Sequence, residues 1–296
     1  MKLKPWLQLF RLPNLPTAPG DALAGAAFFM SGGRGDFSCA VAAGAAALAL
    51  YMFGLADNDI VGNDSDGPER PLARGDISVR AAKAARALCL AVAGIVGACA
   101  GLPPAWWYAA AALAALVFVY NRTKNACLMG ACRGMSVAAG AYAIGMPEGD
   151  VPSMFSVFML VLLVAGWTLY IAAVTKLSEG EESDSEGLGR WRYAWGLGAF
   201  VPLAACLFLD DPRAAVLPAV GSVFAYLAWC VAVGPLGLPH GAPERRRAVG
   251  RAIGALLYLQ IGYMLVSPVK EFLVLAVVLW IAVRIVRRMA PDISGS

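Results

Sequence analysis

The chain has 296 residues, of which 59% are hydrophobic and only 15% charged, and its formal net charge is +4. Soluble domains carry about 25% charged residues, so this composition excludes an ordinary soluble globular domain. Long apolar runs recur from residue 17 to residue 288, each near the ~20 residues that a helix needs to cross a bilayer. Because a backbone in lipid must satisfy its own hydrogen bonds, these runs predict an all-α, polytopic transmembrane helical bundle of nine to ten spans, forming one domain over residues 1–296.

The first expected element is a short amphipathic segment, MKLKPWLQLFRLPN, lying on the membrane surface. We expect no cleavable signal peptide here, because the segment lacks an uninterrupted apolar core and an A-x-A site. Ten candidate spans follow, the first interrupted near its start by Pro19, Gly20 and Asp21. They cover residues 17–32, 37–56, 84–101, 104–120, 129–146, 154–175, 193–209, 214–234, 249–266 and 269–288.

The distribution of lysine and arginine predicts the orientation of these spans. Of the 24 Lys and Arg residues, all but Arg34, Arg213 and Lys270 lie near the two termini or near alternate connections. Because cytoplasmic connections carry the excess of basic residues, both termini and these connections are expected in the cytoplasm. The count favours ten spans, since nine would place the arginines at 284–288 on the other side. The connections concerned are residues 57–83, 121–128, 176–192 and 235–248.

Small and charged residues inside the span 129–146 carry two further expectations. Arg133 lies just inside this span, and charges within membrane spans tend to be functional and paired, so we expect it to contact an acidic residue. Gly130 and Gly134 are typical of close packing between helices.

Acidic residues gather in two of the connections assigned to the cytoplasm, a first acidic loop at 57–83 and a second at 176–192. Mg²⁺ prefers oxygen ligands and is often held by one or two carboxylates together with substrate phosphates. Two facing carboxylate clusters could therefore hold a diphosphate, while the apolar bundle takes a hydrocarbon chain. An isoprenoid diphosphate has both parts. The carboxylates are Asp57, Asp59, Asp64, Asp66, Glu69 and Asp76 in the first loop, and Glu179, Glu181, Glu182, Asp184 and Glu186 in the second.

The order of motifs along residues 11 to about 190 resembles the UbiA superfamily of intramembrane prenyltransferases. Asn58, Asp59 and Asp66 match the family's N-D-x-x-D-x-x-x-D motif, and PERPLARG at 68–75 matches the turn that follows it. YNRTK at 120–124 is similar to the family's Y-x-x-x-K. KLSEGEESD at 176–184 has the length of the second acidic motif, and RLPN at 11–14 resembles the family's opening R-P-x-N.

This resemblance implies a Mg²⁺-dependent prenyltransferase, which joins an isoprenoid diphosphate to an aromatic or lipid-soluble acceptor. It implies a bacterial inner membrane location, contact with membrane lipid and no nucleic acid partner. The implied catalytic residues are Asp59, Asp66 and Asp184. The same three residues, together with Glu181, are the implied metal ligands. The implied diphosphate-binding residues are Asn14, Asn58, Arg70, Lys124 and Lys176.

The chain also departs from the family pattern. Gly62 stands where the first motif has its middle aspartate, and Leu177 and Gly180 stand where the second motif has acidic residues. LMGACRGM at 128–135 resembles the EboC-type subgroup, whose second motif is also degraded. An alternative function is therefore a catalytically reduced UbiA-like protein that binds or relocates a prenylated intermediate. A transporter is disfavoured, because its ionisable residues should lie at mid-membrane rather than at one end.

The individual residues have alternative interpretations that need no ligand. The second acidic loop could simply be solvated, since its glutamates stand in a Gly- and Ser-rich stretch. Arg70 and Lys124 could serve only as cytoplasmic anchors of their spans.

Overall fold

The computed structural model describes residues 3–30, 35–63, 67, 70–145, 154–179, 197–207, 209, 212–233 and 242–293. Within these residues every regular element is a helix, which confirms the predicted all-α bundle. In chain order the elements are α1 (Leu3–Leu9), η1 (Leu12–Thr17), α2 (Ala18–Met30), α3 (Phe37–Gly62), α4 (Val79–Cys99), α5 (Pro104–Thr123), α6 (Ala126–Ala143), α7 (Met154–Glu179), η2 (Leu197–Ala199), α9 (Leu203–Cys206), η3 (Pro212–Ala215), α10 (Val216–Val233), α11 (Ala242–Met264) and α12 (Glu271–Ile293).

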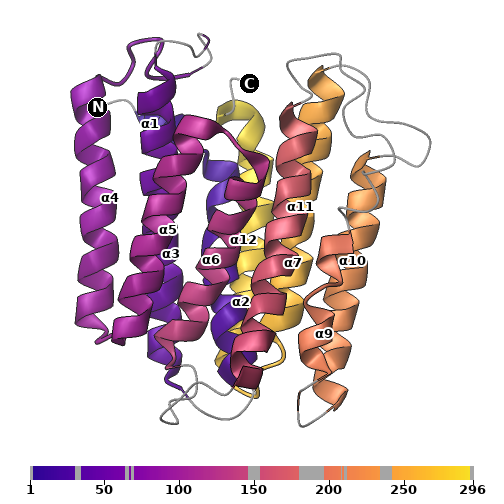
Figure 1. The fold of residues 1–296 in the computed structure, drawn as a ribbon. Helices are drawn as coiled ribbons and strands as arrows, with labels where there is room; N and C mark the ends of the chain where they lie inside the picture. The colour runs from indigo at the N-terminus through magenta and orange to yellow at the C-terminus, as the bar shows by residue number, and fades with distance from the viewer. Residues whose placement is uncertain are drawn as a thin grey trace.

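The long helices stand side by side in one bundle (Figure 1). α4 packs on α3 at one side and α10 packs on α11 at the other, while α6 lies between them in contact with α2, α5 and α7. The C-terminal ends of α3, α5 and α7 all point to the same end of the bundle, which we call the upper end. α1 and the C-terminal end of α12 lie at the same end.

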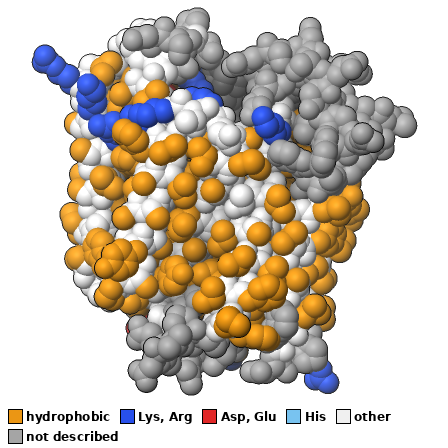
Figure 2. Space-filling view, viewed as in Figure 1, with side chains coloured by type: hydrophobic (Ala, Val, Ile, Leu, Met, Phe, Trp, Pro, Cys, Tyr) orange, Lys and Arg blue, Asp and Glu red, His pale blue; other side chains and the backbone are white. Residues whose placement is uncertain are grey.

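The outer surface of the bundle suits a lipid environment. Five stretches of the described helices are long and apolar enough to cross a membrane, namely α3, α4, α5, Met154–Ser178 and Arg213–Val231. Figure 2 shows hydrophobic side chains covering the flank, with Lys and Arg gathered mainly at the upper end. Leu88 and Ile95 of α4 and Val274 of α12 are each at least 60% exposed. Because water would penalise this apolar flank, the protein is built to lie in a bilayer.

Short polar side chains and a proline determine where the helices of this bundle begin. At the start of α3, Asp36 accepts a hydrogen bond from the backbone N–H of Ser38 at 2.8 Å. Ser78 caps α4 and Asn125 caps α6 in the same way. α5 begins with Pro104, at a position where the missing N–H would have no helical partner. These caps set the points at which the chain re-enters the bundle.

The expected spans at 84–101, 104–120 and 154–175 correspond to α4, α5 and α7, but two other expectations differ from the structure. α3 continues through Gly62 instead of ending at residue 56, so Asp57 and Asp59 lie in a helix. The described part of 193–209 holds only η2 and α9, of three and four residues. Pro202 lies between these short helices, and a proline has no N–H to continue a helical ladder. The number of membrane crossings stays a prediction.

Glycines on α6 let its backbone touch the backbones of two neighbouring helices. A Cβ added at Gly130 would overlap the carbonyl oxygen of Thr168 in α7, and one added at Gly140 would overlap the carbonyl oxygen of Ala22 in α2. Gly134 also faces α7 at close range. The expected close-packing role of Gly130 and Gly134 is therefore confirmed, and α6 is held tightly between α2 and α7.

We expect Gly140→Ala to lower the free energy of unfolding by about 1–3 kcal/mol, because the added methyl group forces two backbones apart. Thermal unfolding in detergent would measure the loss. Gly94→Ala in α4 is the matched control, since a Cβ there meets nothing within 4 Å, and alanine favours a helix by up to about 1 kcal/mol. Equal melting temperatures for the two variants would contradict the close contact between α2 and α6.

Candidate active site

Asp59 forms the centre of a polar cluster at the upper end of the bundle. Its side chain is only 1% exposed, although it lies less than one turn from the end of α3. Arg70, in the turn that follows α3, places Nη1 3.3 Å from Asp59 Oδ1. Asn58 Nδ2 lies 3.5 Å from the same oxygen. The fold thus brings Arg70 next to the Asn58–Asp59 motif, although Arg70 lies 11 residues after Asp59 in the chain.

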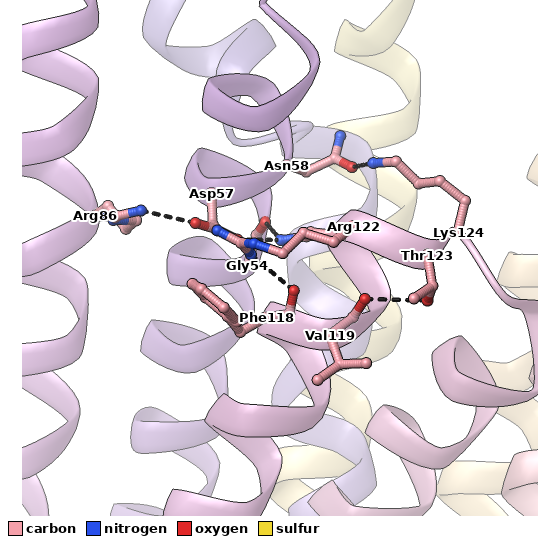
Figure 3. A network of polar contacts seen from close by, with 10 residues as sticks. Gly54, Asp57, Asn58, Arg86, Phe118, Val119, Arg122, Thr123 and Lys124 are labelled. Carbon is pink, nitrogen blue, oxygen red and sulfur yellow. Dashed lines mark hydrogen bonds and ion pairs between the residues drawn. The ribbon is translucent and has the colours of Figure 1, made fainter.

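Lys124 joins this cluster from α5. It ends α5 in a left-handed conformation with φ of 53°, which turns the chain sharply and directs the side chain towards α3. Its Nζ donates a hydrogen bond to Asn58 Oδ1 (Figure 3). Asn58 therefore connects Lys124 with Asp59, because its carbonyl oxygen faces the lysine and its amide nitrogen faces the carboxylate.

Arg11 also lies at this cluster, and it was missing from the predicted site residues. It has a left-handed backbone with φ of 43°, between α1 and η1. Burial lowers the pKa of its guanidinium below the ordinary value, the positive charge of Arg70 lowers it further, and the negative charge of Asp59 acts in the opposite direction. The match of RLPN to the family opening is the sequence signal that could have identified Arg11 as a site residue.

Asp57 belongs to a separate network on the other side of α3. It lies about 200° around the helix from Asp59, because the two are two residues apart. Its fully buried carboxylate lies 2.7 Å from Arg86 Nη1 of α4 and 3.2 Å from Arg122 Nη1 of α5. Asn121 donates to it at 2.9 Å. As Figure 3 shows, Asp57 ties α3 to α4 and α5, so its charge is already balanced by two arginines.

The remaining predicted site residues are placed as follows. Asn14 lies in η1, where its backbone carbonyl oxygen accepts a hydrogen bond from Thr17 Oγ1 at 2.8 Å. Lys176 lies in the last turn of α7, towards the upper end of the bundle. Asp66, Glu181 and Asp184 lie outside the described residues. Within the described ranges, no three His, Cys, Asp or Glu side chains come together as a possible metal site.

A second polar cluster lies inside the bundle, around Asp21 of α2. Asp21 is fully buried, and its Oδ2 lies 2.6 Å from Arg133 Nε of α6. The other oxygen, Oδ1, accepts hydrogen bonds from Trp167 of α7 at 2.9 Å and from Gln260 of α11 at 2.6 Å. The expected pairing of Arg133 with an acidic residue is confirmed, and its partner is Asp21.

The apolar helical bundle, with its polar cluster at one end, defines an integral membrane protein. The model of the UbiA prenyltransferase family matches residues 21–249. The chain therefore belongs to the UbiA prenyltransferase family, as the motifs predicted.

Two solved structures show the same fold. One, from a study of the biosynthesis of digeranylgeranylglyceryl phosphate synthase in membranes, is 17% identical, has a TM-score of 0.58, and aligns with 88% of this chain and 97% of its own. The other, an apo UbiA homolog from Aeropyrum pernix K1, is 20% identical, has a TM-score of 0.56, and aligns with 91% of this chain and 98% of its own. No functionally curated protein matches the sequence.

Proposed function

We propose that this protein transfers a prenyl group from an isoprenoid diphosphate to an aromatic or lipid-soluble acceptor, in a Mg²⁺-dependent reaction within the membrane. The observation that carries the proposal is the buried carboxylate of Asp59, surrounded by cationic side chains at one end of an apolar bundle. Arg70 contacts Asp59 directly, and Lys124 reaches it through Asn58. A ligand with an anionic head and a hydrocarbon tail matches this arrangement of a charged cluster at one end of an apolar bundle.

The charges around Asp59 favour a polyanion. In the described part of this cluster, the cations Arg11, Arg70 and Lys124 gather around one carboxylate. Arginine and lysine bind phosphate oxygens through charge-assisted hydrogen bonds, so these side chains would bind a diphosphate. The resemblance to the family motifs also implies diphosphate contacts for Lys176 and Asn14.

Asp59 also fits a magnesium site. A buried carboxylate beside a diphosphate gives the oxygen ligands that Mg²⁺ requires, because the ion commonly takes one or two carboxylates and completes its shell with phosphate oxygens and water. When bound, Mg²⁺ would stabilise the negative charge that develops on the departing diphosphate. Asp66, Asp184 and Glu181 are the further ligands we propose.

The chain's own residues then have distinct tasks. Arg70 and Lys124 hold the diphosphate while the bond between its oxygen and the first prenyl carbon breaks, with both electrons leaving on the oxygen. Their positive charge stabilises the leaving group, a role that is strongest in a site shielded from water. A new bond forms between that carbon and the acceptor, which loses a proton. We place this site, and both termini, on the cytoplasmic face of a bacterial inner membrane.

Purified protein in detergent or nanodiscs would be tested with allylic diphosphates from geranyl to long-chain, together with a mixture of aromatic acceptors. We expect release of diphosphate that requires both Mg²⁺ and an acceptor, with one chain length preferred. If no diphosphate is either released or bound, the resemblance extends to architecture alone.

A second candidate function follows from the acidic residues that are missing. Gly62, Leu177 and Gly180 stand at positions where the family motifs have acidic residues. With fewer ligands the protein would bind or relocate a prenylated intermediate without turnover. Saturable, Mg²⁺-dependent binding of an isoprenoid diphosphate without release would favour this function over transfer.

A further inference from the structure

The buried cluster around Asp21 ends on the short helix η1, which leads to the candidate active site. Thr17 is the last residue of η1, and its carbonyl oxygen accepts hydrogen bonds from Arg133 Nη2 at 2.9 Å and from Gln260 Nε2 at 2.8 Å. Asp21 contacts the same two side chains. Arg133 and Gln260, from α6 and α11, therefore bind the junction of η1 and α2 at two points, the carbonyl of Thr17 and the carboxylate of Asp21.

Stability alone does not account for this arrangement. A buried ion pair often contributes no more than well-packed apolar side chains of the same volume, because both charges must leave water. Ionisable groups inside a membrane bundle are rare and tend to serve function. Apolar side chains could not donate the two directional hydrogen bonds to the Thr17 carbonyl. These bonds hold the backbone of η1 at a defined place relative to α6 and α11.

The opposite end of η1 lies beside the candidate active site. Arg11 directly precedes this helix, and the positive charge of Arg70 acts on its guanidinium. The position of η1 therefore determines where Arg11 lies relative to Arg70 and Asp59. Within η1, Thr17 Oγ1 donates to the carbonyl of Asn14 at 2.8 Å, which links the anchored end of the helix to its middle. A shift of the anchored end would therefore move Arg11 relative to Arg70.

We propose that Asp21 and Arg133 are positioning residues, which hold η1 so that Arg11 lies beside Asp59 and Arg70, where the diphosphate binds. The inference rests on the proposed function for the identity of the ligand. Asp21 and Arg133 act through η1 and do not touch the substrate. Trp167 and Gln260 support them by donating to the Asp21 carboxylate.

The test variant is Asp21→Asn/Arg133→Met, which leaves no buried charge unpaired but removes the arginine donor to Thr17. Gly97→Ala is the control for a general loss of stability, because a Cβ there would overlap the ring of Trp106 between α4 and α5. Amide hydrogen exchange is measured first, without ligand. We expect residues 3–17 to exchange about tenfold faster in the double variant and at an unchanged rate in Gly97→Ala. Unchanged exchange in the double variant would overturn the inference.

The second measurement is a double-mutant cycle on the affinity for an isoprenoid diphosphate in the presence of Mg²⁺. If Asp21 and Arg133 act through Arg11, neutralising the pair should weaken binding about tenfold in the wild-type background and less than about twofold in an Arg11→Gln background. Gly97→Ala should have equal effects in both. Additive effects of the pair and Arg11 would refute the positioning role and leave the proposed function standing. A wild-type chain that binds no diphosphate would refute the proposed function, and the exchange rates alone would then decide whether the pair anchors residues 3–17.

Discussion

Asp59→Asn should reduce Mg²⁺-dependent diphosphate release by about 100-fold or more. The carboxylate is buried beside Arg70, so bulk water cannot compensate for the loss of its negative charge. An amide keeps the shape and the hydrogen bond but gives a poor ligand for a hard cation. It also removes the negative charge beside Arg70, and losing one preorganised electrostatic group in an active site costs a factor of this size. Single-turnover release of diphosphate from the preferred isoprenoid substrate would measure the effect.

Asp76→Asn is the matched control for this experiment. Asp76 lies in the same connection between α3 and α4, but its carboxylate is 39% exposed and pairs with Arg74 at 2.8 Å. Exposed ion pairs contribute little, so this variant should release diphosphate at the wild-type rate. Equal activities of the two variants would show that Asp59 has no special part in the reaction.

Arg133→Leu should destabilise the folded protein more strongly than Gly140→Ala. It leaves the fully buried carboxylate of Asp21 with hydrogen bonds from Trp167 and Gln260 but without its paired cation. Breaking a buried pair by removing one partner costs about 3–5 kcal/mol, because the remaining charge is uncompensated. We expect a large fall in melting temperature in detergent, or a loss of folded protein during expression.

Two further variants test whether the uncompensated charge of Asp21 explains this loss of stability. Asp21→Asn in the same chain removes the stranded charge, so it should restore a substantial part of the lost stability. Arg86→Leu is the comparison, because the equally buried Asp57 keeps Arg122 and Asn121 as partners. If Arg86→Leu proved as harmful as Arg133→Leu, charge compensation would not explain the loss.

The helices were predictable where the sequence contains a long apolar run. The runs that become α4, α5 and α7 are long and apolar, and an isolated backbone in lipid has to be helical. The extension of α3 through Gly62 was not predictable in this way, since acidic residues after an apolar run usually indicate a loop. Here Asp57 finds Arg86 and Arg122 on neighbouring helices, and these contacts between distant residues keep the last turns of α3 helical.

Part of the candidate site could also be predicted. The resemblance to the UbiA motifs implied Asn58, Asp59, Arg70 and Lys124 as site residues, and the structure places these four together. The sequence also indicated that Arg133 needs an acidic partner. It could not identify that partner, because Asp21 is over a hundred residues away and only the packing of α2 on α6 brings them together. The EboC-type resemblance and the roles of Asp66, Glu181 and Asp184 stay predictions.

The diphosphate binding that we propose beside Arg11 and Arg70 can be measured as a rise in the melting temperature of the protein. A ligand that binds only the folded state raises the melting temperature according to its affinity. At a concentration of 100 times the dissociation constant, the added stability is about 2.7 kcal/mol. Melting curves with different isoprenoid diphosphates would therefore rank chain lengths before any acceptor is known, and inorganic diphosphate would separate the contribution of the headgroup from that of the tail.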